Sequence, residues 1–234
     1  NEDSYRVVAP TDLPENVDAI FVVADGMGGH AAGEVASQIT VDSVIATLTS
    51  AVAFDIEDAD LLNALKSAVL NANSEVIAEG VRSPEKRGMG TTCTLGVIRG
   101  GFLYIAHIGD SRGYLLSDRV LGRITDDHSL VEEEVRKGLL TPEEAWYDPR
   151  SNIITRAIGL DETPEVDTVS VALKAGDRVM FCSDGLNSMI QDPEIESIMN
   201  QGDAGDAVQS LIDAANEAGG SDNVTVVVAD VVSQ

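Results

Sequence analysis

The chain has 234 residues, 15 of them basic and 40 acidic, which gives a formal net charge of -25. Its hydrophobic fraction of 44% is enough for a full core in one large domain or two small ones. The charge argues against binding to nucleic acid or anionic membranes, which need basic faces, and no apolar run approaches the roughly 20 residues of a membrane span.

The first 90 residues predict two strands followed by two helices. The second strand is a run of β-branched and aromatic residues that ends at Asp25, where the chain breaks into glycines. Gly80 is the expected C-cap of the second helix. The predicted strands are 4–8 and 18–25, and the predicted helices are 32–51 and 60–80. The expected inward faces are Val35, Ile39, Ser43, Ala46 and Leu48 on the first helix, and Leu61, Leu65, Ala68, Val69, Ala72 and Val76 on the second.

Strand patterns dominate the next part of the chain. Gly100-Gly101 is a hairpin signal, and a second hairpin is expected around Ser117-Asp118. We interpret this part as an antiparallel meander, which makes a Rossmann fold an unfavourable assignment because no βαβ pattern is present. The expected strands are 91–98, 102–108, 113–116 and 120–124.

Residues 126–158 interrupt the strand pattern with charge clusters and two short helical pieces, 130–137 and 142–146. We interpret this segment as a mobile insert beside a site, because long irregular insertions are often functional. The alternative is a stable helical excursion without a role. Strands at 165–172, 177–183 and 224–232 and helices at 193–200 and 204–218 complete one domain over 1–234. The fold class is α+β, with two stacked sheets and helices outside.

Acidic residues recur where strands begin or end. Singly, an aspartate before glycine is most simply a turn former. If the strands lie side by side, however, their ends meet at one edge, and gathered carboxylates would repel each other unless cations held them. Ligands that are all oxygen favour Mg²⁺ or Mn²⁺ over zinc, and two such ions can activate water. The acidic positions are Glu2, Asp3, Asp25, Asp110, Asp184 and Asp222.

The cysteines and histidines play smaller parts in this interpretation. Cys93 and Cys182 lie in apolar runs and are expected to be buried free thiols, as in a reducing cytosol. His30 can carry a proton near neutral pH, or it is simply a surface residue of a turn. His107 is expected to be packed, and His128 is expected to anchor the insert.

Six motifs, in this order along the chain, resemble the PPM family, the metal-dependent type 2C serine/threonine protein phosphatases, in its bacterial branch. They cover nearly the whole sequence, and each alone is weak. The resemblance implies a four-layer sandwich: two central antiparallel sheets flanked by pairs of helices, with 126–158 as a flap. The motifs are Asn1-Glu2-Asp3, Asp25-Gly26-Met27-Gly28-Gly29-His30, Gly88-Met89-Gly90-Thr91-Thr92, Gly109-Asp110-Ser111-Arg112, Ser183-Asp184-Gly185-Leu186 and Ser221-Asp222-Asn223-Val224-Thr225-Val226.

The resemblance also implies site roles. Asp25 bridges two Mg²⁺ or Mn²⁺ ions, the Gly26 carbonyl binds one of them, and Asp184 with Asp222 holds the other. Glu2 and Asp3 act directly or through coordinated water. Asp110, with Asp184, forms a third and weaker metal site. His30 protonates the leaving oxygen of serine or threonine. The family's phosphate-binding arginine lies upstream of Asn1, so the substrate-binding residue is not in this sequence.

The implied function is hydrolysis of phosphoserine and phosphothreonine in proteins by a water that bridges the two metals. Implied partners are phosphorylated proteins, including serine/threonine kinases and their targets. We expect a cytoplasmic monomer that binds no nucleic acid and has no membrane segment in this chain; the full-length protein could be tethered by a segment not present here. Two alternatives stay open: a non-catalytic phosphoprotein-binding module of the same fold, and a phosphatase for a small phosphorylated metabolite.

Overall fold

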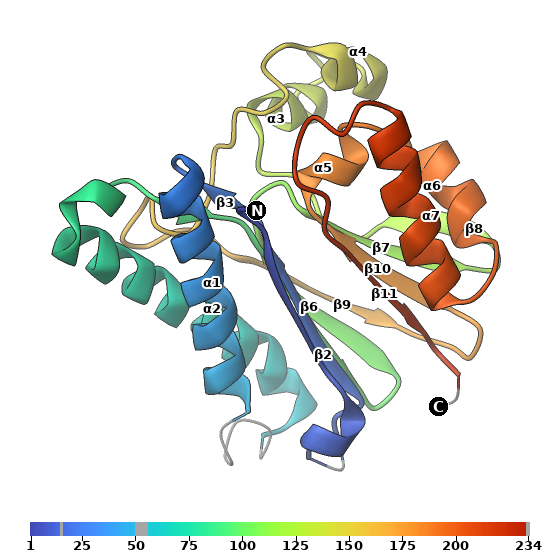
Figure 1. Ribbon diagram of the computed structural model, residues 1–234. Helices are drawn as coiled ribbons and strands as arrows, with labels where there is room; N and C mark the ends of the chain where they lie inside the picture. Colours follow the sequence, from blue (N-terminus) through green and yellow to red (C-terminus); the bar gives the residue numbers. More distant parts are fainter. Residues whose placement is uncertain (15, 50–55, 233–234) are drawn as a thin grey trace.

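The computed structural model describes residues 1–14, 16–49 and 56–232. The predicted end of the first helix, Ala51, lies outside these residues. The described strands form two larger antiparallel sheets and one small two-stranded sheet, and Figure 1 shows helices on the outer side of each larger sheet. The α+β class predicted from the sequence is confirmed.

The first sheet has five strands in the order β1-β2-β5-β6-β9. All neighbours in it are antiparallel, and Ser4 lies opposite Ala24, so the start of β1 meets the end of β2. The short pair of β3 and β4 continues from the end of β2. The strand bounds are β1 (Ser4–Val8), β2 (Ala19–Ala24), β3 (Gly26–Met27), β4 (Gly90–Thr91), β5 (Cys93–Arg99), β6 (Phe102–Ile108) and β9 (Asp167–Ala172).

The second sheet has four strands in the order β11-β10-β7-β8. The expected meander is therefore wrong at one point, because β6 pairs with β5 and β9 while β7 pairs with β10 and β8. The turn 109–111 carries the chain from one sheet to the other. This change of sheet brings the ends of strands from both sheets to the same region. The bounds are β7 (Arg112–Ser117), β8 (Val120–Arg123), β10 (Arg178–Cys182) and β11 (Val226–Asp230).

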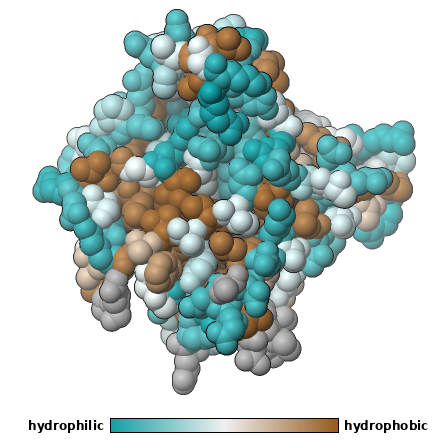
Figure 2. All heavy atoms as spheres, turned by 180° about the vertical axis from the view of Figure 1, so that it is seen from behind, coloured by the Kyte–Doolittle hydropathy of each residue, from teal (hydrophilic) through white to brown (hydrophobic). Residues whose placement is uncertain are grey.

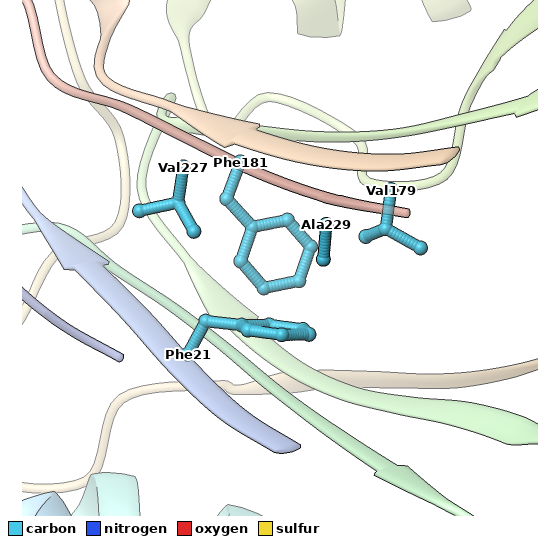
Figure 3. Close-up of a pocket in the computed structure, with 5 residues that line it drawn as sticks. All are labelled: Phe21, Val179, Phe181, Val227 and Ala229. Carbon is cyan, nitrogen blue, oxygen red and sulfur yellow. The ribbon is translucent and has the colours of Figure 1, made fainter. Parts of the chain in front are cut away.

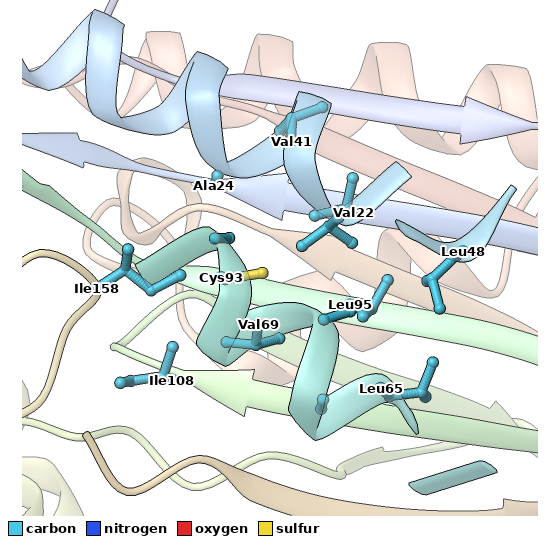
Figure 4. Packing of buried hydrophobic residues seen from close by; sticks show 14 of the residues in the cluster. Val22, Ala24, Val41, Leu48, Leu65, Val69, Cys93, Leu95, Ile108 and Ile158 are labelled. Carbon is cyan, nitrogen blue, oxygen red and sulfur yellow. The ribbon is translucent and has the colours of Figure 1, made fainter. Parts of the chain in front are cut away.

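Helices cover the outer face of each larger sheet. The pair α1 and α2 packs on the first sheet, and α6 and α7 pack on the second (Figure 1). Figure 4 shows Val41 and Leu48 of α1 and Leu65 and Val69 of α2 facing strand residues such as Leu95. The helix bounds are α1 (His30–Leu48), α2 (Asp58–Arg82), α3 (Leu130–Arg136), α4 (Pro142–Tyr147), α5 (Asp184–Asn187), α6 (Asp192–Met199) and α7 (Ala204–Glu217), with 3-10 turns η1 (Pro10–Asp12) and η2 (Pro84–Lys86).

The inner faces of the two sheets meet in a third apolar cluster. Its centre is the pair Phe21 of β2 and Phe181 of β10, whose rings meet edge to face with centroids 5.6 Å apart. Figure 3 shows Val179, Val227 and Ala229 around these rings. The aromatic pair therefore fixes how the two sheets, and the strand ends that they carry, lie relative to each other.

Gly96 on β5 makes room for the Phe181 ring, since a Cβ at that position would lie 2.6 Å from two ring carbons. We expect Gly96→Ala to lower the free energy of unfolding by about 1–3 kcal/mol through overpacking between the sheets. Urea denaturation measures this effect. Gly122→Ala is the matched control, because its nearest neighbour is an oxygen 3.9 Å away. Equal stability of the two variants would contradict this account of the sheet interface.

Three further differences from the sequence expectations have physical causes. Gly80 lies inside α2, which ends with Ser83 as its C-cap, so Gly80 is not the cap. On α1 the prediction is wrong at Ala46, which is exposed, whereas Ser43 and Leu48 are buried as expected; Ala36 is also buried, because a small residue allows close packing without adding to a hydrophobic stripe. The single turn α5 after β10 was not expected. Both cysteines are buried and free.

The surface is largely hydrophilic, as the charge requires. Figure 2 shows the face opposite to that of Figure 1, where hydrophilic residues surround an apolar patch near the middle. In the described part of the chain, no helix combines the length and the apolar character needed to cross a bilayer.

Candidate active site

Asp25 follows directly after β2, as predicted, and its backbone is held from both sides. The Thr91 hydroxyl donates to the Asp25 carbonyl oxygen at 2.8 Å, and the Thr92 N–H donates to the same oxygen at 2.9 Å. The Asp25 N–H donates to the Thr92 hydroxyl oxygen at 2.9 Å. These three bonds fix the backbone from which the Asp25 side chain projects.

Gly26 lies where no other residue fits. A Cβ on Gly26 would collide with the carbonyl oxygen of Gly33 in α1 and lie 2.6 Å from the Glu2 carbonyl oxygen. A Cβ on Gly33 would collide in turn with the Glu2 carboxylate. The two glycines therefore allow α1, the N-terminal segment and the end of β2 to meet, and they bring the Glu2 side chain to this meeting point.

Asp3 joins the N-terminal segment to the second sheet. It precedes β1, whose pairing with β2 sets it next to Asp25. Its Oδ2 accepts a hydrogen bond from the Ser183 hydroxyl at 2.8 Å. Because Ser183 is the N-cap residue of α5, which begins at Asp184, this contact places Asp3, Asp25 and Asp184 together.

The loop before β11 packs on the start of α5. A Cβ on Gly185 would collide with the Asn223 carbonyl oxygen, so only glycine allows this approach. The Asn223 side chain accepts from the Glu2 N–H at 2.7 Å. Asp222 itself is exposed, and its negative charge acts on Asp184. The loop thus adds its carboxylate at the outer side of the group.

Asp110 lies in the turn that joins the two sheets, and it is 6% exposed. Its Oδ1 is one of three buried side-chain N or O atoms in the described residues that have no hydrogen-bond partner. The charges of Asp184 and Asp127 act on it. The next residue, Ser111, exchanges a 2.7 Å hydrogen bond with the Thr92 hydroxyl, which links this turn to the residues that hold Asp25.

Burial and mutual repulsion disfavour the charged forms of these carboxyl groups. Burial, followed by the charges of Asp184 and Asp3, raises the pKa of Asp25 to about 11. Burial also raises the pKa of Asp3, and burial with the charge of Asp222 raises that of Asp184. Burial, followed by Asp184, raises the pKa of Asp110. The side chain of Asp25 lies next to those of both Asp3 and Asp184, so the three carboxyl groups act directly on one another.

The residues present fit divalent cations. Among the described residues, no three histidine, cysteine or acidic side chains already stand as a ready-made metal-binding group. The Asp3 carboxylate instead accepts from the Ser183 hydroxyl, and the charges of Asp3, Asp25 and Asp184 act on one another. A cation would offset this repulsion, and it would satisfy the unpaired Asp110 oxygen. A donor set made only of oxygen favours Mg²⁺ or Mn²⁺.

The raised pKa values predict how pH affects the metal-free protein. The folded protein keeps protons on these carboxyl groups at pH values where the unfolded chain has released them, because the ordinary pKa of an aspartate is 3.8. The stability of the metal-free protein should therefore fall as the pH rises from about 4 towards the folded pKa of Asp25, about 11. We therefore expect the melting temperature in EDTA to decrease between pH 5 and pH 8, and Mg²⁺ to restore it increasingly at the higher pH. Calorimetric scans across this range measure both trends. A metal-free melting temperature that rises with pH, or one that Mg²⁺ does not change, would contradict the fit of cations to this site.

The three histidines occupy different places. His30 is the first residue of α1, directly after Gly29 with its φ of 89°, and its side chain lies outside the described part of the structure. His107 is buried in β6, as predicted, and bonds to the Thr94 hydroxyl at 3.0 Å. His128 does anchor the insert: its carbonyl oxygen accepts from the Thr155 N–H at 2.7 Å, and its Nε2 contacts Asp167 at 3.1 Å.

Sequence reasoning missed one buried ion pair beside the site. The Arg112 Nε and Nη2 atoms donate to the Asp127 carboxylate at 2.7–3.0 Å, and the Asp127 charge acts on both Asp110 and Asp184. The positive charge of Arg112, at the start of β7, also acts on Asp110 and Asp184. The sequence reasoning also missed the supporting roles of Thr92 and Ser183. Hydroxyl residues at the ends of apolar strands, directly beside the candidate acids, were the available signal.

Together, the fold and the all-oxygen carboxylate group define a candidate two-metal hydrolase. A family model described as "Protein phosphatase 2C" matches residues 1–223. The chain therefore belongs to the protein phosphatase 2C family, as its motifs indicated.

Bacterial relatives place the chain more narrowly. It is 44% identical over 213 residues to the serine/threonine protein phosphatase PstP of Mycobacterium tuberculosis. The aligned part covers 91% of this chain and 40% of PstP. It is 38% identical over 237 residues to the serine/threonine phosphatase stp of Listeria monocytogenes, covering 98% of this chain and 90% of that protein. The chain thus spans two fifths of PstP and most of stp.

A solved structure gives the same match in three dimensions. The catalytic domain of PstP, crystallised in complex with two manganese ions, superimposes with a TM-score of 0.83 at 42% identity, covering 99% of this chain and 92% of that one. The manganese ions belong to that relative.

Proposed function

We propose that this chain hydrolyses phosphoserine and phosphothreonine in proteins with the help of two Mg²⁺ or Mn²⁺ ions. The observation that carries the proposal is that Asp3, Asp25, Asp110 and Asp184 lie close enough to act on one another, and that burial and mutual repulsion disfavour the charged form of each carboxyl group when no cation is bound. Membership of the phosphatase family and the manganese-bound relative support it.

The side chains divide the binding work by position. Asp25, which lies between Asp3 and Asp184, would contact both ions, with the Gly26 carbonyl beside it. Asp184 and Asp222 would hold one ion from the second sheet. Glu2 and Asp3 would act from the N-terminal segment, directly or through water. Asp110, with its unpaired Oδ1, would form a third and weaker site together with Asp184.

The protein's own groups prepare the site for attack on phosphorus. When bound, the ions lower the pKa of water and withdraw charge from the phosphate oxygens. Thr91 and Thr92 hold the backbone of Asp25 in place, which helps to preorganise the site. Both cysteines are buried, and burial raises the pKa of each thiol to about 12, so neither has the character of a nucleophile. His30, at the start of α1, would give the proton to the departing serine or threonine oxygen.

The same proposal covers the architecture around the site. We take the layers as the family's four-layer sandwich, and residues 1–234 as one catalytic domain with 126–158 as its flap. The chain would act as a monomer on phosphorylated proteins, including kinases and their targets. Its strong negative charge disfavours nucleic-acid partners.

The direct test is turnover of a phosphothreonine peptide with Mn²⁺, with sugar phosphates assayed in parallel. The proposal predicts Mn²⁺-dependent release of phosphate from the peptide in clear preference to the sugar phosphates. Turnover that persists undiminished in EDTA would refute the metal role. A preference for sugar phosphates would assign the chain to small metabolites, and tight Mn²⁺ binding without turnover would indicate a regulatory binding module.

A further inference from the structure

The flap, defined as residues 126–158, is a compact unit around two short helices. Thr141 and Glu144 form a capping box that closes the start of α4. The Arg150 guanidinium donates to both oxygens of Glu134 in α3 at 3.0 and 2.9 Å, and it also contacts Asp148. The Arg150 bonds tie α3 to the segment that follows α4, while Glu132 ties α3 to the body of the protein by accepting from Arg123 of β8 at 2.7 Å.

One side chain joins α4 to the body of the protein. The Trp146 indole N–H donates to the Asn187 carbonyl oxygen at 2.9 Å. In the described part of the chain, this is the hydrogen bond that links α4 to residues outside the flap. In α4 only Ala145 is buried, and Tyr147 is 68% exposed. The Tyr147 ring meets the Trp146 ring edge to face, with the ring centroids 4.6 Å apart. Trp146 is therefore the main attachment of α4.

The acceptor of this bond belongs to the helix that begins with a candidate metal ligand. Asn187 ends α5, and Asp184 starts it. Carbonyl groups at a helix C-terminus lack partners within the helix, so the indole acts as a cap for α5. Since α5 is only four residues long, the capped end is one turn away from Asp184. Figure 1 shows α4 and α5 on the same side of the molecule.

We propose that Trp146 latches the flap to α5, and that this latch couples the position of the flap to the helix that carries Asp184. In this arrangement Trp146 is a positioning residue: a cation that orders Asp184 also orders the flap through Asn187. The coupling to cations rests on the proposed function, whereas the latch itself does not.

Amide hydrogen exchange on the metal-free protein tests the latch. Trp146→Phe keeps an aromatic ring and removes the donor, so exchange in residues 139–149 should become about five- to tenfold faster, the factor expected for one hydrogen bond of ordinary strength. Tyr147→Phe is the matched control on the same helix and should exchange like the wild type. Strand β5 should be unchanged in both variants, which shows that the fold is intact.

Exchange with Mg²⁺ tests the coupling. In the wild type, Mg²⁺ should slow exchange both around Asp184 and in residues 139–149. In Trp146→Phe it should slow exchange around Asp184 alone. Trp146 is the only tryptophan in the chain, so acrylamide quenching of the wild-type fluorescence gives a second measure, and Mg²⁺ should lower the quenching constant.

The outcomes separate the two proposals. Unchanged exchange in residues 139–149 of metal-free Trp146→Phe overturns the latch. A Mg²⁺ effect on those residues that is equal in Trp146→Phe and the wild type overturns the coupling. If Mg²⁺ slows exchange nowhere near Asp184 in either protein, the metal-dependent function fails and the coupling fails with it, while the metal-free comparison still decides the latch. With a functional enzyme, Trp146→Phe should raise KM for a phosphoprotein and leave turnover of a small aryl phosphate within twofold.

Discussion

Replacing Asp184 by asparagine is expected to lower kcat for a phosphothreonine peptide by roughly 10²–10³-fold or more, because the variant keeps the size of the side chain and loses the charge that holds a cation. Asp25→Asn should have an effect at least as large, since Asp25 lies between Asp3 and Asp184. Steady-state kinetics at saturating Mn²⁺ measure the loss. Asp213→Asn, an exposed acid on the outer helix α7, is the control and should retain wild-type activity.

The same variants carry a second, opposite expectation. In EDTA, Asp25→Asn should melt at a higher temperature than the wild type, because it removes a carboxyl group whose charged form is disfavoured by burial and by Asp184. Loss of activity together with a gain in metal-free stability would distinguish a strained metal site from a structural hydrogen-bond network. Full turnover by Asp184→Asn, or a lower metal-free melting temperature for Asp25→Asn, would count against the account.

Asp127→Ala is expected to lower the free energy of unfolding by up to about 3–5 kcal/mol, because it removes the close carboxylate partner of the Arg112 guanidinium and leaves only the longer, 3.6 Å contact with Asp192. Urea denaturation measures the change. The double variant Asp127→Ala, Arg112→Leu should recover part of the loss, since it also removes the charge that has lost its main partner. Asp42→Ala is the control. Asp42 pairs with Arg6 at 3.5 Å, and both side chains are more than half exposed, so losing this pair should lower the free energy of unfolding by less than about 1 kcal/mol. A double variant that is less stable than Asp127→Ala would refute this explanation.

The helices show which parts of the fold the sequence could predict. The buried face of α2 was predicted residue by residue from Leu61 to Val76, because its large apolar side chains repeat at helical spacing. The face of α1 was predicted in part: Ser43 and Leu48 are buried and Val35 and Ile39 pack against the core, but Ala46 is exposed. The buried Ala36 and Thr40 were missed because small and polar residues give no hydrophobic signal.

The change of sheet after β6 was hidden for a different reason. Gly109-Asp110-Ser111 has the composition of any tight turn, and whether β7 pairs with β6 or with β10 depends on contacts made far along the chain. Local propensity carries no information about that choice. The change of sheet nevertheless places Asp110 near Asp184, so the topology matters directly for the site.

The sequence predicted the acidic residues of the candidate site but not the residues that hold them in place. Asp25 and Asp184 are recognisable because each ends an apolar strand before a glycine. The bond from Ser183 to Asp3 spans 180 positions, and the fork between Arg112 and Asp127 depends on how the flap leaves the sheet, so neither can be read from spacing. The hydroxyl residues beside the acids were visible in the sequence, but the partner that each one binds is visible only once the chain is folded.

Diffraction from crystals grown in saturating Mn²⁺, with data collected at the manganese absorption edge, tests the central claim most directly. The account predicts two strong anomalous peaks among Asp25, Asp184 and Asp222, with a weaker third peak beside Asp110. Asp25, Asp184 and Asp222 found apart from one another, or a carboxylate group without any anomalous peak at saturating Mn²⁺, would contradict it.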